Sequence, residues 1–147
     1  MLADAGQDSG VINFLADRPF GGKASATPFD SDNIVVPVTT IDVEARARGL
    51  EAPYLIKLDT HGFEDPILKG AEETLRATEV IVIECYNFKI SPECLLFYEM
   101  CARLQALGFR SVDLVDPLYR PVDRVFWQID LVFVRSDRPE FRFANYK

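Results

Sequence analysis

Apolar positions along the chain fall into short runs whose spacing predicts strands separated by helices. The run over residues 80–86 is almost purely apolar, as expected for a strand covered on both faces of a sheet. Residues 18–32 instead collect Gly, Pro, Ser and Asp, which predicts a long irregular loop. Pro37 lies within another apolar run and favours a sheet edge or a strand end there. The predicted strands cover residues 11–16, 34–40, 54–59, 80–86, 109–115 and 126–134.

Capping residues predict three helices between these strands. Thr40 is the expected N-cap of the first helix. Asp65 and Ser91 each stand directly before a proline, which predicts an N-cap followed by Pro at the first helical position of the other two. Gly70 is expected to weaken or bend the second helix. The predicted helices cover residues 41–50, 66–76 and 92–107. Gly49 is expected to end the first helix and Gly108 the third.

From residue 54 onward the elements alternate as strand, helix, strand, helix, strand, strand, which is typical of an α/β fold. The ten residues between the last two strands contain two prolines and favour an antiparallel hairpin over a helical crossover. Parallel strands are therefore expected first and an antiparallel pair last. Ligands of open α/β sheets bind beyond the carboxyl ends of the strands. Because Asp59 ends one predicted strand and Glu84 nearly ends the next, both residues point to the same rim.

Length and charge narrow the class of protein. The chain has 147 residues, which suits one domain, and a formal net charge of −7. This acidic balance disfavours nucleic acid or an anionic membrane surface as a partner, because phosphates need cationic side chains. Three cysteines without a CxxC pair argue against a disulfide framework and favour a reducing cytoplasm. No apolar run approaches the roughly 20 residues that span a bilayer.

Residues 55–75 read LIKLDTHGFEDPILKGAEETL and carry a recognisable pattern: a strand, then Asp-x-x-Gly-x-Glu, then a Gly-Ala pair. The residues that make up the pattern are Asp59, Gly62, Glu64, Lys69, Gly70 and Ala71. This stretch resembles the signature of the FkbM-type S-adenosylmethionine-dependent methyltransferases. The strand at residues 36–42, the IEC of residues 83–85 and the closing WQIDLVFV of residues 127–134 fit the family as well. His61 departs from the acidic or glutamine residue that is more common at its position.

The resemblance implies a class I methyltransferase fold, a Rossmann-like sheet of seven strands in the order 3-2-1-4-5-7-6. On that map residues 54–59 are strand 4, residues 80–86 are strand 5, and the closing hairpin supplies strands 6 and 7. Strands 1 and 2 have no counterpart, nor does the Gly-rich turn that cradles the methionine part of the cofactor. The pair at residues 21–22 does not supply this turn, because no convincing strand precedes it and no helix follows it. Residues 1–147 are therefore expected to form a single methyltransferase-like domain that lacks the N-terminal cofactor-binding strands of a longer enzyme.

This expected omission affects the strand at residues 54–59. In the family fold that strand pairs with strand 1 at the centre of the sheet. Without strand 1 it becomes an apolar edge, which invites aggregation or pairing with another chain. The isolated chain is therefore expected to be poorly soluble or to form a homodimer through this strand.

Three residues close to the end of that strand are candidate catalytic groups. Asp59 can orient an acceptor hydroxyl or take its proton, and the resemblance also makes it the candidate contact to the cofactor S-adenosyl-L-methionine; the alternative is a turn Asp bonded to backbone N–H groups. His61 can take the proton because imidazole titrates near neutral pH, or it is simply a partly exposed turn residue. Glu64 lies just before a predicted helix, where the helix dipole stabilises a carboxylate without any catalytic role.

The next strand carries the candidate substrate contacts Glu84, Tyr86 and Asn87. Glu84 lies in an apolar strand, and a buried carboxylate needs a partner, for which Lys57 on the neighbouring predicted strand is one candidate. Structural pairing and substrate contact both stay open for Glu84. Tyr86, Asn87 and Trp127 can pack against a sugar or an aromatic acceptor, although ordinary core packing also explains Trp127.

These residues fit three functions. The first is S-adenosylmethionine-dependent O-methyl transfer to a hydroxyl of a sugar, a polysaccharide or a secondary metabolite. The resemblance implies this function, and no residue is assigned as a metal ligand for it. The second is a metal-dependent hydrolase whose ion is held by Asp59, His61, Glu64 and Glu84. The third is a noncatalytic fragment that keeps the acceptor side of the fold and lacks its cofactor side. The sequence favours a methyltransferase by descent.

Overall fold

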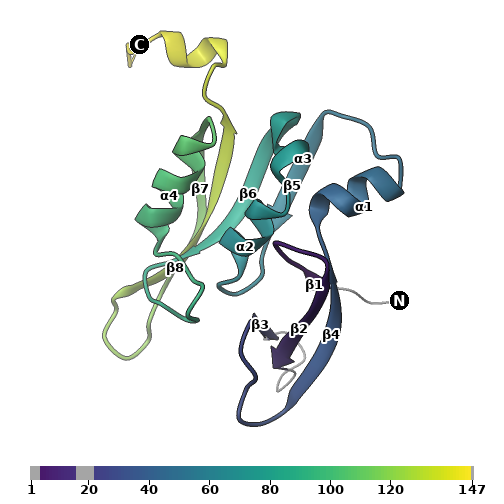
Figure 1. The fold of residues 1–147 in the computed structure, drawn as a ribbon. Helices are drawn as coiled ribbons and strands as arrows, with labels where there is room; N and C mark the ends of the chain where they lie inside the picture. Colours follow the sequence, from purple (N-terminus) through teal and green to yellow (C-terminus); the bar gives the residue numbers. More distant parts are fainter. Residues whose placement is uncertain (1–3, 16–21, 147) are drawn as a thin grey trace.

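The central feature of the molecule is a mixed sheet of four strands, shown in Figure 1. The computed structural model describes residues 4–15 and 22–146. The strands of this sheet are β5 (Tyr54–Leu58), β6 (Thr78–Tyr86), β7 (Phe109–Tyr119) and β8 (Phe126–Arg135). The spatial order is β5-β6-β8-β7, with β5 and β6 parallel and the other neighbours antiparallel. The prediction of parallel strands followed by an antiparallel hairpin is confirmed. The order also equals the 4-5-7-6 part of the sheet that the resemblance implies.

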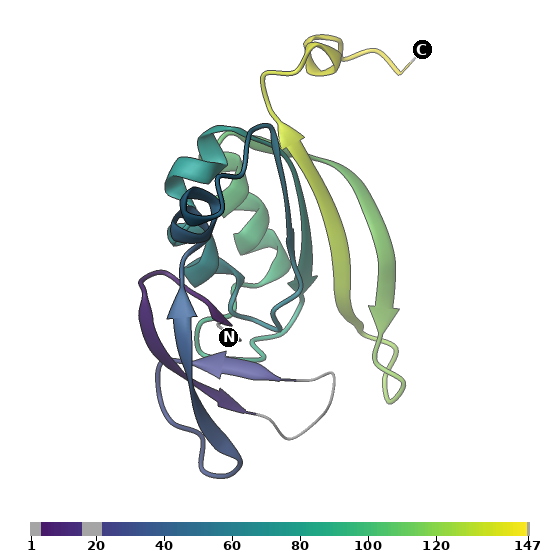
Figure 2. The same ribbon diagram turned by 90° about the vertical axis from the view of Figure 1, so that its right-hand side faces the viewer.

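The α-helices of the described residues lie on one face of this sheet and leave the other face open (Figure 2). On the covered face Ile56, Ile83 and Leu131 join a buried cluster with Leu68 and Leu104 from the helices. The helices are α1 (Ile41–Ala47), α2 (Glu64–Lys69), α3 (Glu72–Arg76) and α4 (Phe97–Ala106), and a 3-10 turn, η1 (Pro139–Arg142), follows β8. Within the described ranges, every helix falls short of the length and apolar character needed to cross a bilayer.

The predicted second helix is two helices that meet at Gly70, where a bend was expected. Gly70 is the C-cap of α2, and a Cβ atom at this position would lie 2.1 Å from the backbone oxygen of Gly6. The prediction that Asp65 caps this helix is wrong, because Phe63 is the N-cap residue. The carboxylate of Asp65 instead bonds Lys69 at 2.8 Å and Arg103 of α4 at 2.9 Å. The Asp65 carboxylate is therefore engaged by Lys69 at the end of α2 and by Arg103 of α4.

The third helix starts later than predicted and ends as predicted. It begins at Phe97, with Leu96 as N-cap and the Glu99 carboxylate accepting the Leu96 N–H at 2.8 Å. The proposed start at Ser91 is wrong, because Ser91 caps only a local turn by accepting the Cys94 N–H at 3.1 Å. The helix stops before Gly108, which has a φ of +85°.

A second sheet of four strands lies next to the helices, and the sequence did not predict it. Its strands are β1 (Asp4–Ala5), β2 (Gly10–Leu15), β3 (Lys23–Ser25) and β4 (Asn33–Thr39), in the order β1-β4-β2-β3. Strands near 11–16 and 34–40 were predicted, although Ala16 lies outside the described residues, but one sheet was expected and β3 lies where a loop was expected. Ile12, Ala24 and Val38 of this sheet join the same hydrophobic cluster as the central sheet. Packing against that cluster stabilises the pairing of these four strands, which the local sequence pattern does not indicate.

Candidate functional site

The buried side chain of Glu64 stabilises the turn between β5 and α2. One carboxylate oxygen of Glu64 accepts the N–H groups of Gly62 at 3.0 Å and Thr60 at 3.3 Å, and the Thr60 hydroxyl at 3.1 Å. Burial raises the pKa of Glu64, and these bonds only partly offset that effect. Glu64 was a candidate catalytic residue, and the structure places it inside the turn as an organiser of the backbone.

This turn directs His61 back over the ends of the strands. His61 has a φ of +52° and Gly62 one of +97°, so two consecutive residues adopt left-handed backbone angles. A Cβ on Gly62 would also lie 2.8 Å from the Ser91 hydroxyl, which donates to the Gly62 carbonyl at 2.9 Å. Because a non-glycine residue adopts such an angle only at some cost, the surrounding bonds must hold His61 in place.

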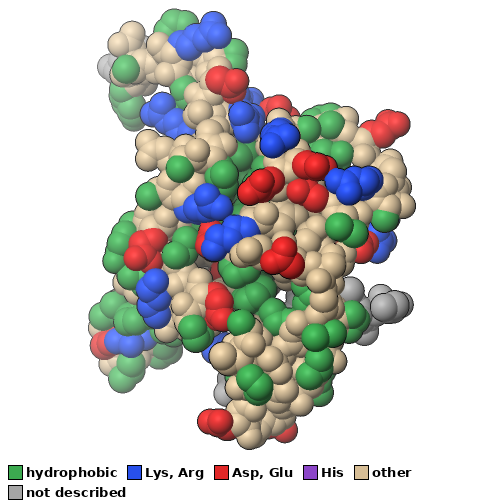
Figure 3. Space-filling model, in the orientation of Figure 1, with side chains coloured by type: hydrophobic (Ala, Val, Ile, Leu, Met, Phe, Trp, Pro, Cys, Tyr) green, Lys and Arg blue, Asp and Glu red, His purple; other side chains and the backbone are tan. Residues whose placement is uncertain are grey.

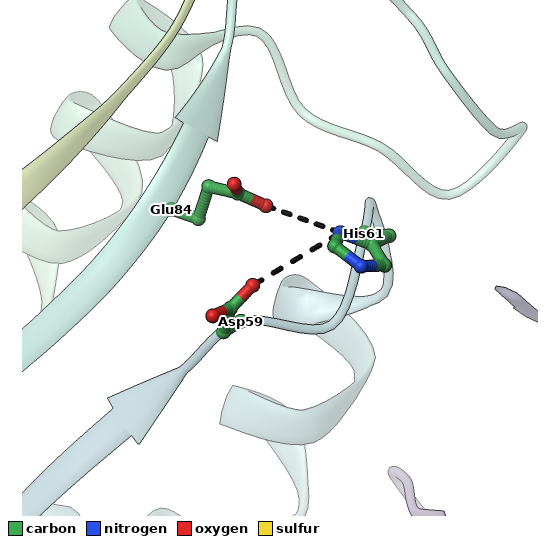
Figure 4. Close-up of side chains that lie close together, drawn as sticks. All are labelled: Asp59, His61 and Glu84. Atoms are coloured by element: carbon green, nitrogen blue, oxygen red, sulfur yellow. Dashed lines mark hydrogen bonds and ion pairs between the residues drawn. The ribbon is translucent and has the colours of Figure 1, made fainter. Parts of the chain in front are cut away.

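His61, Glu84 and Asp59 converge at the rim, as Figure 4 shows. The Nδ1 atom of His61 lies 3.2 Å from Glu84 Oε2, 3.0 Å from the Tyr86 hydroxyl and 4.0 Å from Asp59 Oδ1. These residues come from the β5–α2 turn and from the end of β6. The prediction that Asp59 and Glu84 share one rim is therefore confirmed.

Glu84 lies at the centre of this cluster and is 8% exposed. It accepts hydrogen bonds from the Tyr86 hydroxyl and from the Gln128 side-chain amide of β8. Lys57, one candidate partner of Glu84, forms its ion pair with Asp59 at 2.9 Å instead. The three partners of Glu84 are thus an imidazole, a phenol and an amide.

The hydrogen bonds around Glu84 determine which nitrogen of His61 carries a proton. Burial and the bond to Glu84 raise the pKa of Tyr86, so the phenol keeps its proton and donates it to Glu84. The carboxylate and the phenol oxygen are then both acceptors towards Nδ1 of His61. Nδ1 must therefore carry the hydrogen, and Nε2 keeps its lone pair.

The remaining candidates differ in their surroundings. The Asp59 side chain is 48% exposed, and its bond to Lys57 raises the pKa of that lysine. Asn87, a candidate substrate contact, joins β6 to β8: its side-chain amide donates to the Phe126 carbonyl at 3.1 Å, and its backbone N–H to the Trp127 carbonyl at 2.8 Å. Tyr86 also meets the Trp127 ring edge-on, with centroids 6.3 Å apart.

Two residues at this rim were missed by the sequence interpretation. Gln128 and Asp130 lie on β8 directly opposite Tyr86 and Glu84 in the strand register. Burial raises the pKa of Asp130, and the charge of Asp59 adds to this shift. Polar side chains two residues apart in an otherwise apolar strand were the signal that could have identified both.

The cluster can support two kinds of chemistry. One ligand atom from each of Asp59, His61 and Glu84 lies within 4.8 Å of the others, which is a set that a divalent cation can use. Glu64 is not part of this group, so the predicted set of four ligands is reduced to three. Alternatively, Nε2 of His61 can accept a proton while Glu84 holds Nδ1.

One comparison with known proteins finds a match. The model of the family described as "Methyltransferase FkbM domain" matches residues 5–111, which include the turn and Glu84 and stop before β8. No curated protein and no solved structure matches the chain.

Proposed function

The chain belongs to the FkbM methyltransferase family, and we propose that it transfers a methyl group from S-adenosyl-L-methionine to a hydroxyl group of a sugar, polysaccharide or secondary metabolite. The observation that carries this proposal is the imidazole of His61, held through Nδ1 by Glu84 at 3.2 Å. It supplies an oriented base where ligands of α/β sheets bind. The aromatic rings of Tyr86 and Trp127 close to this rim support an acceptor with a ring.

The charge of the rim fits the proposed cofactor. S-adenosylmethionine carries a positively charged sulfur and an amino group, and when bound it supplies the electrophilic methyl group that the acceptor hydroxyl attacks. Asp59 and Asp130 both bring carboxyl groups to this rim; burial raises the pKa of Asp130, and the charge of Asp59 adds to that shift. Asp59 is the residue that would hold the cationic part of the cofactor, because half of its side chain is accessible, and the cofactor would compete there with Lys57.

Four residues of the chain would have separate roles in the proposed methyl transfer. Nε2 of His61 accepts the proton of the acceptor hydroxyl, which makes the oxygen a better nucleophile. Glu84 holds the imidazole in the required tautomer and stabilises the positive charge that the ring gains. Tyr86 and Gln128 donate to Glu84 and so keep its carboxylate in place. Orientation of the two reactants supplies the rest of the rate enhancement.

A metal-dependent hydrolase is the second candidate function, because the ligand atoms of Asp59, His61 and Glu84 lie within 4.8 Å of one another. A cation there would compete with Lys57 for the Asp59 carboxylate. Elemental analysis after dialysis separates the two functions. A stoichiometric ion that restores hydrolysis after removal would favour the hydrolase, and a metal-free protein would exclude it.

Transfer of a radiolabelled methyl group from S-adenosylmethionine to a panel of hydroxyl compounds tests the first proposal. His61→Ala is expected to reduce the rate by about 10²- to 10⁴-fold, the usual contribution of a general base. Glu84→Gln should also reduce it, whereas Glu79→Gln, the same change at an exposed site on the same strand, should not. Folded protein that neither binds S-adenosylmethionine nor transfers methyl groups would instead support a noncatalytic chain.

Two further properties belong to this proposal. We propose a reducing, cytoplasmic compartment because Cys85, Cys94 and Cys101 are all free thiols.

We also propose a homodimer through β5, which has β6 on one side and no strand of the described residues on the other. Leu55 on this strand is 66% exposed and adds apolar surface beside the unpaired edge. A monomer by light scattering would contradict the dimer.

A further inference from the structure

A groove on the helix-covered side of the molecule gathers positive charge. It lies between the α2–α3 pair, the end of α4 and the end of β8, and has a volume of about 420 Å³. Its lining residues are Leu68, Glu72, Leu75, Arg76, Arg103, Ala106, Leu107 and Arg135. Figure 3 shows Lys and Arg side chains, with acidic side chains beside them, over the space between α4 and α3. None of the lining residues belongs to the cluster around His61.

Three arginines against one glutamate is an unusual balance for this chain, whose net charge is −7. Arg103 has a structural role, since it bonds Asp65 at 2.9 Å. Arg135 stacks over the Phe109 ring, with its guanidinium carbon 4.9 Å from the centroid. In the described part of the chain, neither Arg76 nor Arg135 forms an ion pair within 4.0 Å. Two guanidinium groups at this groove therefore keep their full capacity to bind an anion.

The floor of the groove is apolar. Leu68 and Leu75 are buried beneath it, 1% and 5% exposed, and Ala106 and Leu107 at the end of α4 supply the accessible apolar surface. A volume of this size is typical of sites for small molecules, which combine an apolar lining with a few polar groups. Guanidinium groups prefer planar or tetrahedral oxyanions that they can bond with two N–H groups at once. The groove thus combines a place for an apolar body with a place for an anionic head.

We propose that this groove binds a small organic anion, with a carboxylate or phosphate head at Arg76 and Arg135 and an apolar body on Ala106 and Leu107. The site is separate from the proposed methyl-transfer site and does not depend on it. Glu72 restricts the ligand to one whose anionic head lies away from α3's first turn, because two negative charges repel. A bound anion would offset part of the positive charge that the arginines concentrate there.

Calorimetric titration of the full chain with octyl phosphate tests the proposal, with inorganic phosphate and octyl glucoside as the head-only and body-only probes. Octyl phosphate should bind at one site, inorganic phosphate more weakly, and octyl glucoside more weakly still. Arg76→Gln and Arg135→Gln should each weaken octyl phosphate binding about tenfold, because each removes a charge-assisted bond. Arg142→Gln removes an exposed arginine elsewhere and should leave binding unchanged.

The outcomes distinguish the proposal from general attraction to positive charge. Equal weakening by all three variants, or no binding to the unmodified chain, would overturn it. Circular dichroism and urea unfolding check that each variant is folded. If Arg135→Gln fails to fold because it loses the stack on Phe109, Arg76→Gln decides alone, since Arg76 is exposed.

Discussion

The two faces of the central sheet are built from the same strands and differ in almost every other respect. On the covered face of β6, Ile81 and Ile83 are fully buried against the helices. On the open face the same strand presents Val82 and Glu84, and Glu84 meets His61 and Gln128. Because side chains alternate along a strand, one segment supplies both the core and the rim.

The difference separates stability from chemistry. The covered face is filled by aliphatic side chains that form one cluster with the helices, so changes there should unfold the protein. The open face holds the Asp59–His61–Glu84 cluster, whose side chains lie close to one another and whose Glu84 also bonds the polar groups of Tyr86 and Gln128. Changes there should alter activity more than the free energy of unfolding.

The largest expected effect comes from comparing neighbours on β6. Ile83→Ala removes a fully buried side chain and should lower the free energy of unfolding by about 3–4 kcal/mol. Val82→Ala, one residue away on the open face, should cost less than about 1 kcal/mol, because its side chain is partly solvated already. Urea denaturation measures both. Equal losses would mean that the open face is covered as well.

A smaller effect is expected at the start of α2, beneath the turn that carries His61. Asp65→Asn removes the charged bonds to Lys69 and Arg103 and should cost about 1–2 kcal/mol at neutral pH. Burial alone would raise the pKa of Asp65, but these bonds outweigh it and lower the pKa below 3.8. The stabilisation is therefore present above that value and is lost as the pH falls through the lowered pKa. Asp137→Asn, at an exposed position, is the matched control for urea unfolding at pH 7 and pH 3.

The smallest effect concerns Glu64, whose contribution to stability depends on pH in the opposite direction to that of Asp65. Burial raises its pKa above 4.5, so the folded protein holds this proton more tightly than the unfolded chain does. Its contribution to stability is therefore largest below pH 4.5 and declines as the pH rises through the raised pKa. In Glu64→Gln this decline should disappear from the stability profile, while Glu79→Gln should keep it. An unchanged profile in Glu64→Gln would show that Glu64 is solvated.

Much of the central sheet was predictable because its signals are local. Apolar runs predicted β5, β6 and β8, two prolines predicted the hairpin, and Thr40 caps α1 as expected, accepting the Val43 N–H at 3.1 Å. The second sheet was not predictable in this way, because β3 has three residues and is stabilised by pairing with β2. The start of α4 was misplaced because the Ser-Pro signal also fits an isolated turn.

The site was predictable in its residues and less so in their roles. Strand ends located Asp59 and Glu84, but the partners of Glu84 depend on the register between β6 and β8, which brings Gln128 opposite Tyr86. The sequence also could not show that Glu64 turns inward to bond the backbone of Thr60 and Gly62. Both depend on the three-dimensional path of a turn with two left-handed residues.

The central claim is that Glu84 holds His61 through Nδ1 and leaves Nε2 free to accept a proton. His61 is the only histidine in the chain, so ¹⁵N NMR of the imidazole can be assigned without ambiguity. In neutral His61 we expect the hydrogen on Nδ1, and in Glu84→Gln we expect a shift towards the Nε2–H tautomer, with Glu79→Gln unchanged. An Nε2–H tautomer in the unmodified chain, insensitive to Glu84→Gln, would contradict the account.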